Sequence, residues 1–439
     1  MSQTGHSGPG ADGPGATARP ARPADAAGVD ANAAALGAIR DLLARVLPTN
    51  AFQARRLASV GCSAVPASLE DFRVRFPLTT KAELVADQAA FPPYGSNLTF
   101  PTGAYTRCHQ TSGTHGAPMR WLDTPESWSA MTDGWVEVLR QAGVGPGDRA
   151  FFPFSFGPFL GFWLAFEAAQ RLGVLSVAGG GMGSALRLKV ILEQGFTVMC
   201  CTPTYALHLA ETARAEGLDL RRSKVRCLVV AGEPGGSQPA VRARLESAWP
   251  GARVFDHHGM TETGPVTYES AELPGSLVML DDLFFAEVID PVTLAPVPEG
   301  EVGELVLTTL KRVGSPLVRY RTGDRVRPRR WRGRWTFEGG ILGRVDDMVV
   351  VRGVNLHPSA VEAVVRSVEA VGEYRVTVDR TGELAEVSIE AEADPSACGE
   401  LAGRLHQALS LRMAVTPVPV GSLPRFDLKA RRWRTISAA

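Results

Sequence analysis

Between about residue 135 and residue 260, short apolar runs alternate with stretches that have the spacing of amphipathic helices. Helices are expected at 184–194 and 203–215, and the apolar runs around them are RAFFPFSF, GVLSVAG, TVMCCT, VRCLVVAG and ARVFDHHG. Parallel neighbouring strands need a long connection, usually a helix, so this alternation predicts a parallel sheet with crossover helices. Ligands bind beyond the carboxyl ends of the strands in such sheets, which places the expected site there.

The chain has 439 residues, which is more than one hydrophobic core usually supports. Residues 1–33 contain almost no large apolar side chain and are expected to form a disordered tail. From Leu36 apolar residues follow one helical face and open a large domain over 34–345, whose sequence becomes β-rich after Gly264. The predicted fold class is therefore α/β: a large N-terminal domain with parallel sheets, crossover helices and a β-rich subdomain, then a small α+β domain over 346–439.

Charge and hydropathy exclude several classes of protein. The 46 basic residues balance 46 acidic ones, so the chain lacks the electrostatic footprint of a protein that binds nucleic acid or an anionic membrane. The most apolar stretch, FFPFSFGPFLGFWLAF, is interrupted by proline and glycine and is not expected to span a membrane. No signal peptide is visible, and six scattered cysteines indicate reduced thiols, so a cytoplasmic protein with small-molecule ligands is expected.

The segment HQTSGTHGAPMRW combines hydroxyl side chains with glycines in a short loop. Thr111, Ser112, Gly113, Thr114 and Gly116 are the residues concerned. Glycine lets the backbone approach a ligand, while hydroxyls and successive N–H groups suit a phosphate. Such residues also cluster in ordinary turns for local hydrogen bonding, so the loop alone leaves both interpretations open.

A second segment, DHHGMTETGP, follows the end of an apolar strand. Glu262 in this segment can hold Mg²⁺, which favours one or two carboxylates together with substrate phosphate oxygens; a solvated loop acid is the alternative. His257 and His258 suggest zinc, but no further ligands follow at metal-binding spacing, and zinc is not expected.

Three further positions stand out near the domain junction and the C-terminus. Asp324 in YRTGD can accept hydrogen bonds from both ribose hydroxyls, although Gly-Asp turns are common. Asp346, in the charged segment GRVDDMVVVRG, lies where a hinge between domains is expected. Only five of the 46 basic residues are lysine, so Lys429 in LPRFDLKAR marks a place where a compact ammonium matters, unless it belongs to a solvated basic tail.

Taken in order, these segments resemble the adenylate-forming, AMP-binding enzymes, and within them the phenylacetate–CoA ligase branch. The resemblance covers about residues 36–435. TSGTHGAP resembles the family's phosphate loop, GMTETGP its Thr-Glu loop, YRTGD its ribose-binding segment, GRVDDMVVVRG its hinge and LPRFDLKAR its catalytic lysine segment. TVMCCTPTYALHLAE and the AGEP turn at 231–234 are similar to that branch in particular.

The resemblance implies ATP, Mg²⁺ and coenzyme A as cofactors and a small domain that rotates between two half-reactions. It also implies a role for each matching residue, and departs from the family at His115 (usually Thr), Ala117 (where a Lys often stands) and His258 (usually Tyr or Phe). The implied roles are phosphate binding by Thr111, Ser112, Gly113, Thr114, His115 and Gly116; adenine binding by Gly232, Glu233, Pro234 and His258; cofactor binding also by His257 and Gly259; ribose binding by Asp324 and Arg344; catalysis by Thr261, Glu262 and Lys429, with Mg²⁺ on Glu262; and a hinge at Asp346.

The substrate is expected to be an aromatic acid, aryl or arylacetic, activated as an acyl-adenylate and passed to CoA. Phe154, Phe156 and Phe159 lie in a segment rich in glycine and proline, which suits a pocket rim, although such clusters are more often core. This segment contains no basic residue to pair with a second carboxylate, which disfavours a diacid. A carrier protein loaded in trans, a nucleotide-binding pseudoenzyme and a homodimer remain open.

Overall fold

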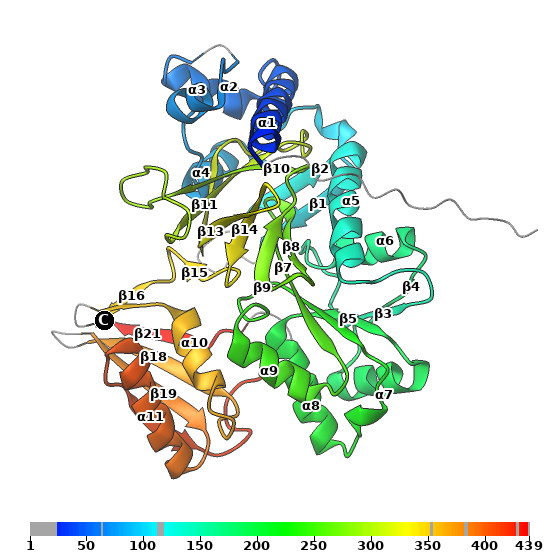
Figure 1. Cartoon of the computed structure of the whole chain (residues 1–439), viewed down its shortest axis with the longest axis vertical. Helices are drawn as coiled ribbons and strands as arrows, with labels where there is room; N and C mark the ends of the chain where they lie inside the picture. The colour runs from blue at the N-terminus through cyan, green and yellow to red at the C-terminus, as the bar shows by residue number, and fades with distance from the viewer. Residues whose placement is uncertain are drawn as a thin grey trace, which may run out of the picture.

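The computed structural model describes residues 24–62, 65–111, 118–351, 354–381, 385–426 and 430–437. A small C-terminal unit, orange to red in Figure 1, lies beside a much larger unit built from the rest of the chain. Among the described residues, no helix is both long enough and apolar enough to cross a lipid bilayer.

A nine-stranded sheet forms the centre of the large unit. Five neighbouring strands at one end of this sheet, the last five in the order given below, run parallel to one another. The other strands pair antiparallel. The expected parallel sheet is thus present, extended by the β-rich segment after residue 264. The strand order is β13 (Pro328–Trp331), β14 (Arg334–Glu338), β9 (Leu273–Met279), β8 (Gly264–Ser270), β7 (Arg253–Met260), β6 (Cys227–Val230), β5 (Val198–Cys201), β3 (Arg149–Phe152) and β4 (Leu175–Ala178).

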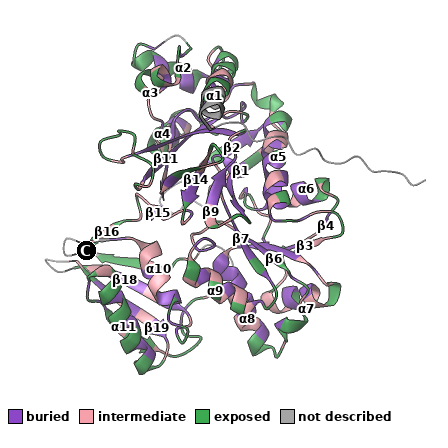
Figure 2. Cartoon of the chain, viewed as in Figure 1, coloured by how far each residue is buried: buried purple, intermediate pink, exposed green. Residues whose placement is uncertain are grey.

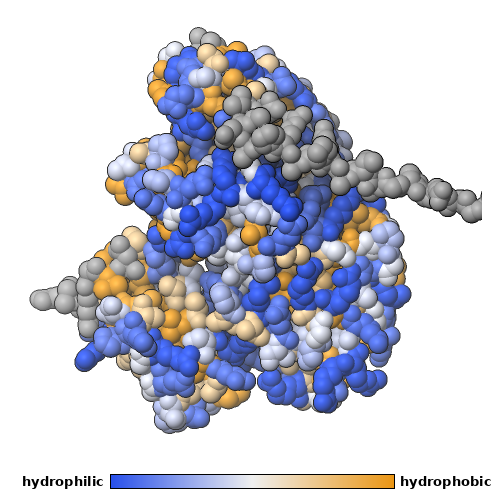
Figure 3. Space-filling model, viewed as in Figure 1, coloured by the Kyte–Doolittle hydropathy of each residue, from blue (hydrophilic) through white to orange (hydrophobic). Residues whose placement is uncertain are grey.

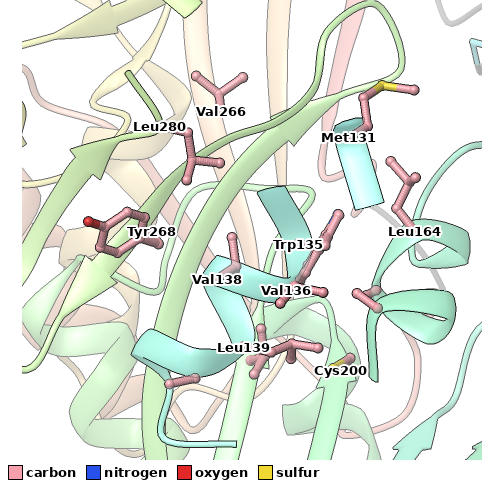
Figure 4. Close-up of a cluster of buried hydrophobic side chains, with 14 of the residues drawn as sticks. Met131, Trp135, Val136, Val138, Leu139, Leu164, Cys200, Val266, Tyr268 and Leu280 are labelled. Atoms are coloured by element: carbon pink, nitrogen blue, oxygen red, sulfur yellow. The ribbon is translucent and has the colours of Figure 1, made fainter. Parts of the chain in front are cut away.

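Helices cover both faces of the parallel part, which explains why its strands read as continuous apolar runs. Alternate residues of β5 belong to different cores: Val198 and Cys200 join the core that includes α5 (Pro125–Gln141) and α6 (Trp163–Arg171), drawn in part in Figure 4. Met199 and Cys201 join the core that includes α7 (Ser184–Gln194), α8 (Pro203–Ala215) and α9 (Pro239–Ala248). The helices expected at 184–194 and 203–215 are confirmed.

A second, antiparallel sheet contains β10 (Phe284–Ile289), β11 (Gly303–Thr309), β12 (Tyr320–Val326) and β15 (Gly343–Arg344). N-terminal helices pack on it through a core that contains Phe72, Phe76 and Phe285. A short hairpin, β1 (Arg107–Gln110) and β2 (Arg120–Asp123), flanks the Thr/Ser/Gly loop, and single 3₁₀ turns occur at Thr102–Ala104 and Leu220–Arg222. The N-terminal helices are α1 (Ala24–Val46), α2 (Ala51–Ser59), α3 (Leu69–Arg75) and α4 (Lys81–Ala90).

The expected tail at 1–33 is wrong in its last third, because α1 begins at Ala24. The segment from 24 to 36 is rich in alanine, which has the highest helix propensity, so a helix forms there without large apolar side chains. Residues 1–23 lie outside the described part of the chain. The face predicted from Leu36 onward is present, with Ile39, Leu42, Leu43 and Val46 buried.

The small unit has the expected α+β composition and its own core, which includes Val376, Ile389, Leu401 and Leu405. Figure 2 shows buried positions on its strands and exposed positions on the outer side of α11 (Pro395–Leu409). A four-stranded sheet has the order β20-β19-β18-β21, in which only the β18–β19 pair is antiparallel. The elements are β16 (Val349–Val351), β17 (Val354–Leu356), α10 (Pro358–Arg366), β18 (Tyr374–Arg380), β19 (Glu386–Glu392), α11 (Pro395–Leu409), β20 (Ala414–Val418) and β21 (Trp433–Ser437).

Candidate functional site

Three of the predicted nucleotide-binding residues meet between the two sheets. The Nε2 atom of His258 lies 3.0 Å from Oδ2 of Asp324, and Nη1 of Arg344 donates to Oδ1 of the same carboxylate at 3.1 Å. Asp324 is buried, while His258 and Arg344 are half-buried. Burial opposes the charge of Arg344, but Asp324, Asp346 and Asp347 raise its pKa, so it stays cationic. Nδ1 of His258 is buried, and within the described part of the chain it has no hydrogen-bond partner.

Strand pairing and a glycine bring this group together. Asp324 on β12 is the register partner of Arg344 on β15. Gly323 has a φ of +78°, and a Cβ there would lie 2.6 Å from Nη2 of Arg344. A side chain at 323 would therefore be strained and would displace the guanidinium, which explains the Gly-Asp sequence.

Glu262 lies in the turn between β7 and β8, and it is buried. Its Oε1 atom is 3.3 Å from Nζ of Lys81, the first residue of α4. The side chain of Lys81 is half exposed. The hydroxyl of Tyr320 belongs to the same environment: burial raises its pKa far above the usual value, and the charge of Glu262 adds to the effect. A buried carboxylate can hold Mg²⁺ together with substrate phosphate oxygens, and the Lys81 ammonium beside it suits the phosphate groups themselves.

Thr261 is held through its backbone. Its carbonyl oxygen accepts a hydrogen bond of 2.8 Å from Nη1 of Arg312. Arg312 is in turn paired with Asp123 through two contacts of 2.7 Å, and both side chains are almost fully buried. This buried charge pair keeps Arg312 in place beneath the Thr261 carbonyl, because loss of either side chain would leave the other charge uncompensated in the core.

His257, which was expected beside the nucleotide, is directed into the core instead. Its Nδ1 atom lies 2.6 Å from the carbonyl oxygen of Thr267, and its ring packs against Trp135 with 4.1 Å between centroids. Burial lowers its pKa to about 3, so the ring is neutral at ordinary pH. Successive residues of a strand point to opposite faces, which is why His257 and His258 have different surroundings. Among the residues described, no group of three or more His, Cys, Asp or Glu side chains could hold a metal ion.

The base of the phosphate loop is described, but most of the loop is not. Thr111 N donates to the carbonyl of Met119 at 2.9 Å, and Thr111 Oγ1 accepts from Met119 N at 3.0 Å. Ser112, Gly113, Thr114, His115 and Gly116 lie outside the described residues, as does Lys429. Their roles stay predictions.

The AGEP turn follows β6 and contacts the C-terminal segment. Gly232 adopts a φ of +94° in this turn. The Oε1 atom of Glu233 accepts from the backbone N of Thr204 at 2.7 Å, and its Oε2 atom accepts from the backbone N of Ala430 at 3.1 Å. Burial and the charge of Glu362 raise the pKa of Glu233, while Arg432 and the hydrogen bond from Thr204 lower it. Pro234 follows in the same turn, and Gly259 sits in a β-bulge where a Cβ would lie 2.7 Å from the carbonyl oxygen of Gly264.

The three phenylalanines of the expected acid pocket contact the large core. Phe154 is buried against Phe156 and Phe162, and Phe156 also packs edge-on to Trp163. Phe156 and Phe159 are only partly buried. The same segment touches the hairpin below the phosphate loop, because the backbone N of Gln110 donates to the carbonyl oxygen of Pro158 at 2.8 Å.

Asp346 lies at the junction between the large and small units. Its carboxylate accepts from Nε and Nη2 of Arg344 at 2.8 and 3.0 Å, and its side chain is 59% exposed. The hinge is compatible with this position and stays a proposal. In the space-filling view, polar and apolar residues are mixed over the face that both units present (Figure 3).

The sequence motifs do not single out Lys81, Tyr320 or Arg312. Lys81 carried a usable signal, since it is one of only five lysines, as is Lys429. Tyr320 precedes the YRTGD glycine by three positions, but its closeness to Glu262 depends on packing between distant segments. Arg312 carries no local signal in an arginine-rich chain.

Comparisons with known proteins find family models and relatives that match this chain. Residues 110–310 match the family model described as AMP-binding enzyme, and residues 353–434 match the model described as AMP-binding enzyme C-terminal domain. The phenylacetate-coenzyme A ligase of Pseudomonas putida is 30% identical over 84% of this chain and 86% of its own length. The phenylacetate-coenzyme A ligase of Thermus thermophilus is 34% identical over 74% of this chain and 72% of its own length.

The fold also matches solved structures of 2-hydroxyisobutyryl-CoA ligase, which is 30% identical to this chain. A structure in the postadenylation state, in complex with 2-HIB-AMP, gives a TM-score of 0.87 over 93% of this chain and 90% of the other. A structure of that ligase with 2-HIB-AMP and CoA in the thioesterification state gives 0.71 over 95% and 91%. The higher score indicates that the two units here are arranged more as in the postadenylation state.

Proposed function

The chain belongs to the AMP-binding enzymes and is an AMP-forming acid–CoA ligase that uses ATP, Mg²⁺ and CoA, and on this premise we propose that its acid is aromatic, of the aryl or arylacetic type. In the first half-reaction a carboxylate oxygen attacks the α-phosphorus of ATP and pyrophosphate leaves. In the second, the CoA thiol attacks the acyl carbon and AMP leaves.

We assign the nucleotide to the group around Asp324. The carboxylate would accept hydrogen bonds from the ribose hydroxyls, with Arg344 holding it in place. His258 would face the base, with its imidazole ring available to stack on adenine. Glu262 would hold Mg²⁺, which neutralises charge on the phosphates, and Lys429 would act on the reacting carboxylate.

The aromatic acid rests on one observation, the contact between the phenylalanine segment and the loop base. The hydrogen bond from Gln110 to Pro158 ties the segment that carries Phe154, Phe156 and Phe159 to the strand leading into the phosphate loop. Partly buried aromatic rings at that place offer edge-to-face surface for a substrate ring. Phenylacetate–CoA ligases are also among the relatives of this chain.

A small hydroxy acid is the second candidate, favoured by polar side chains around the glycine loop at 179–183. Nε of Arg187 donates to the carbonyl oxygen of Gly179 at 3.0 Å, and the Ser184 hydroxyl lies 3.0 Å from the Tyr205 hydroxyl. A Cβ at Gly180 would lie 3.2 Å from the carbonyl oxygen of Ser155, so this glycine loop packs against the phenylalanine segment. The similar structures of 2-hydroxyisobutyryl-CoA ligase point to the same alternative.

The test is ATP–pyrophosphate exchange with a panel of acids that includes phenylacetate, benzoate and 2-hydroxyisobutyrate, followed by product analysis with CoA. The proposal predicts exchange and thioester with the aromatic acids at kcat/KM well above that of the hydroxy acid. A preference for 2-hydroxyisobutyrate would overturn the aromatic assignment. Transfer to an added holo carrier protein but not to CoA would favour the carrier-loading alternative, and no exchange with any acid would favour the pseudoenzyme.

A further inference from the structure

The carboxylate of Glu233 joins two segments that are more than 200 residues apart in sequence. One oxygen accepts from Thr204 N, at the start of α8, and the other accepts from Ala430 N, in the C-terminal segment. Ala430 directly follows Lys429 in the sequence. The turn expected to hold adenine therefore makes a direct contact with the segment expected to supply the catalytic lysine.

Other contacts between the units surround this one. Nε of Arg425 lies 3.0 Å from Oε2 of Glu211 on α8, and Nη1 of Arg432 lies 3.3 Å from the hydroxyl of Thr204. On the neighbouring helix, Nη2 of Arg244 donates to the carbonyl oxygen of Val371 at 2.6 Å. Arg425 is also held by Glu392 within the small unit, at 2.7 and 2.9 Å. Loss of Glu211 would thus leave Arg425 with a partner.

We propose that Glu233 is a positioning residue for the adenylation half-reaction, which holds the C-terminal segment against the large unit through Ala430 N. The inference rests on the proposed function, in which this segment contributes to adenylation. A carboxylate offers two acceptor oxygens and satisfies both backbone donors, which no neutral side chain of the same length does. Glutamine keeps one acceptor but presents an amide N–H group to the other donor.

This role differs in a measurable way from simple adenine binding, the role implied by the resemblance. A residue that only lines adenine changes the KM for ATP when it is replaced. A residue that positions the segment changes kcat for adenylation at saturating ATP, and its loss leaves thioester formation from a supplied acyl-adenylate unchanged because the first half-reaction is bypassed.

The experiment compares Glu233→Gln with Glu211→Gln, which removes another contact of the same interface without touching Ala430. Glu233→Gln should lower kcat for pyrophosphate exchange roughly tenfold, the cost of one hydrogen bond to a charged group, and keep the rate of thioester formation from acyl-adenylate. Glu211→Gln should change neither rate by more than about twofold, as expected for a partly exposed ion pair. A rise in KM for ATP alone, or equal losses in both half-reactions, would overturn the proposal.

Limited trypsin digestion gives a second readout that does not depend on activity. Because the contact to Ala430 restrains the segment, Glu233→Gln should speed cleavage after Arg431 several-fold over the wild-type chain, and Glu211→Gln should not. Equal cleavage rates in the two variants would refute the positioning role even if the wild-type chain proved inactive with every acid. Wild-type inactivity with fast cleavage of Glu233→Gln would instead refute the proposed function and keep the contact.

Discussion

The Nε2 atom of His258 lies 3.0 Å from Oδ2 of Asp324, so the side chain expected to face adenine contacts the carboxylate expected to bind ribose. A nucleotide that uses both oxygens of Asp324 must compete with this contact. Binding of the ribose through both oxygens would therefore replace the hydrogen bond between His258 and Asp324.

Replacement of this histidine should make ATP binding easier. In His258→Phe, Asp324 no longer has to release an imidazole, and the larger ring gives more surface for stacking on adenine. We expect KM for ATP in pyrophosphate exchange to fall about two- to tenfold, and His406→Phe, at an exposed position of α11, to leave it unchanged. A higher KM for ATP in His258→Phe would show that the imidazole itself contributes to nucleotide binding.

Removing the negative charge of Glu262 should raise the requirement for Mg²⁺. Glu262→Gln keeps the shape of the side chain but weakens its hold on a hard cation, and Lys81 loses its ion-pair partner. A Mg²⁺ titration of the exchange rate should shift to higher concentration by roughly tenfold or more, whereas Glu338→Gln, an exposed acid paired with Arg329, should not shift it. Identical titrations for the wild-type chain and Glu262→Gln would remove Glu262 from the metal site.

A fixed backbone at the junction should impair only the step that follows domain rotation. Proline locks φ near −65°, so Asp346→Pro should slow overall thioester formation by at least tenfold, with single-turnover adenylation nearly kept. Asp346→Ala is the matched control, because it also loses the contacts to Arg344 but leaves φ free. If both variants slow thioester formation equally, the Arg344 contact matters and a hinge at Asp346 is contradicted.

The buried His257 should make the protein less stable in acid. Its pKa falls from about 6.5 when unfolded to about 3 when folded, because burial disfavours the charged ring. Between these values the unfolded chain binds more protons, so this contribution to the free energy of unfolding is complete above pH 6.5. It is lost as the pH falls toward 3, by up to about 1.4 kcal/mol per pH unit.

The measurement compares the wild-type chain with His257→Asn, whose amide nitrogen can still donate to Thr267. Burial raises the pKa of Asp256 to about 6, so its titration stabilises the folded protein as the pH falls from 6 to 3.8, opposite to the effect of His257. The quantity to follow is therefore the difference in unfolding free energy between the wild-type chain and His257→Asn. Urea unfolding at several pH values should show this stability difference in favour of the wild-type chain shrinking as pH falls. A difference independent of pH would contradict a neutral buried His257.

The sequence predicted the elements whose signal is local. The strands and helices between 149 and 260 are recognisable because burial on both faces leaves continuous apolar runs between helices. The start of α1 was missed because its alanines give helix propensity without the large side chains that mark a core. Lys81 and Glu262 are 181 residues apart, and nothing in either segment predicts that α4 would bring them within 3.3 Å. The different surroundings of His257 and His258 follow from strand alternation, so this error was avoidable.

The central claim is that the chain activates a carboxylate in a step that depends on Lys429. The most direct test measures both half-reactions of Lys429→Ala: pyrophosphate exchange with the best acid, and conversion of the supplied acyl-adenylate to the CoA thioester. Loss of one preorganised donor costs about 10²–10³ in rate, so exchange should fall by that factor while thioester formation stays near the wild-type rate. Normal exchange in Lys429→Ala, or an equal loss in both half-reactions, would contradict the account.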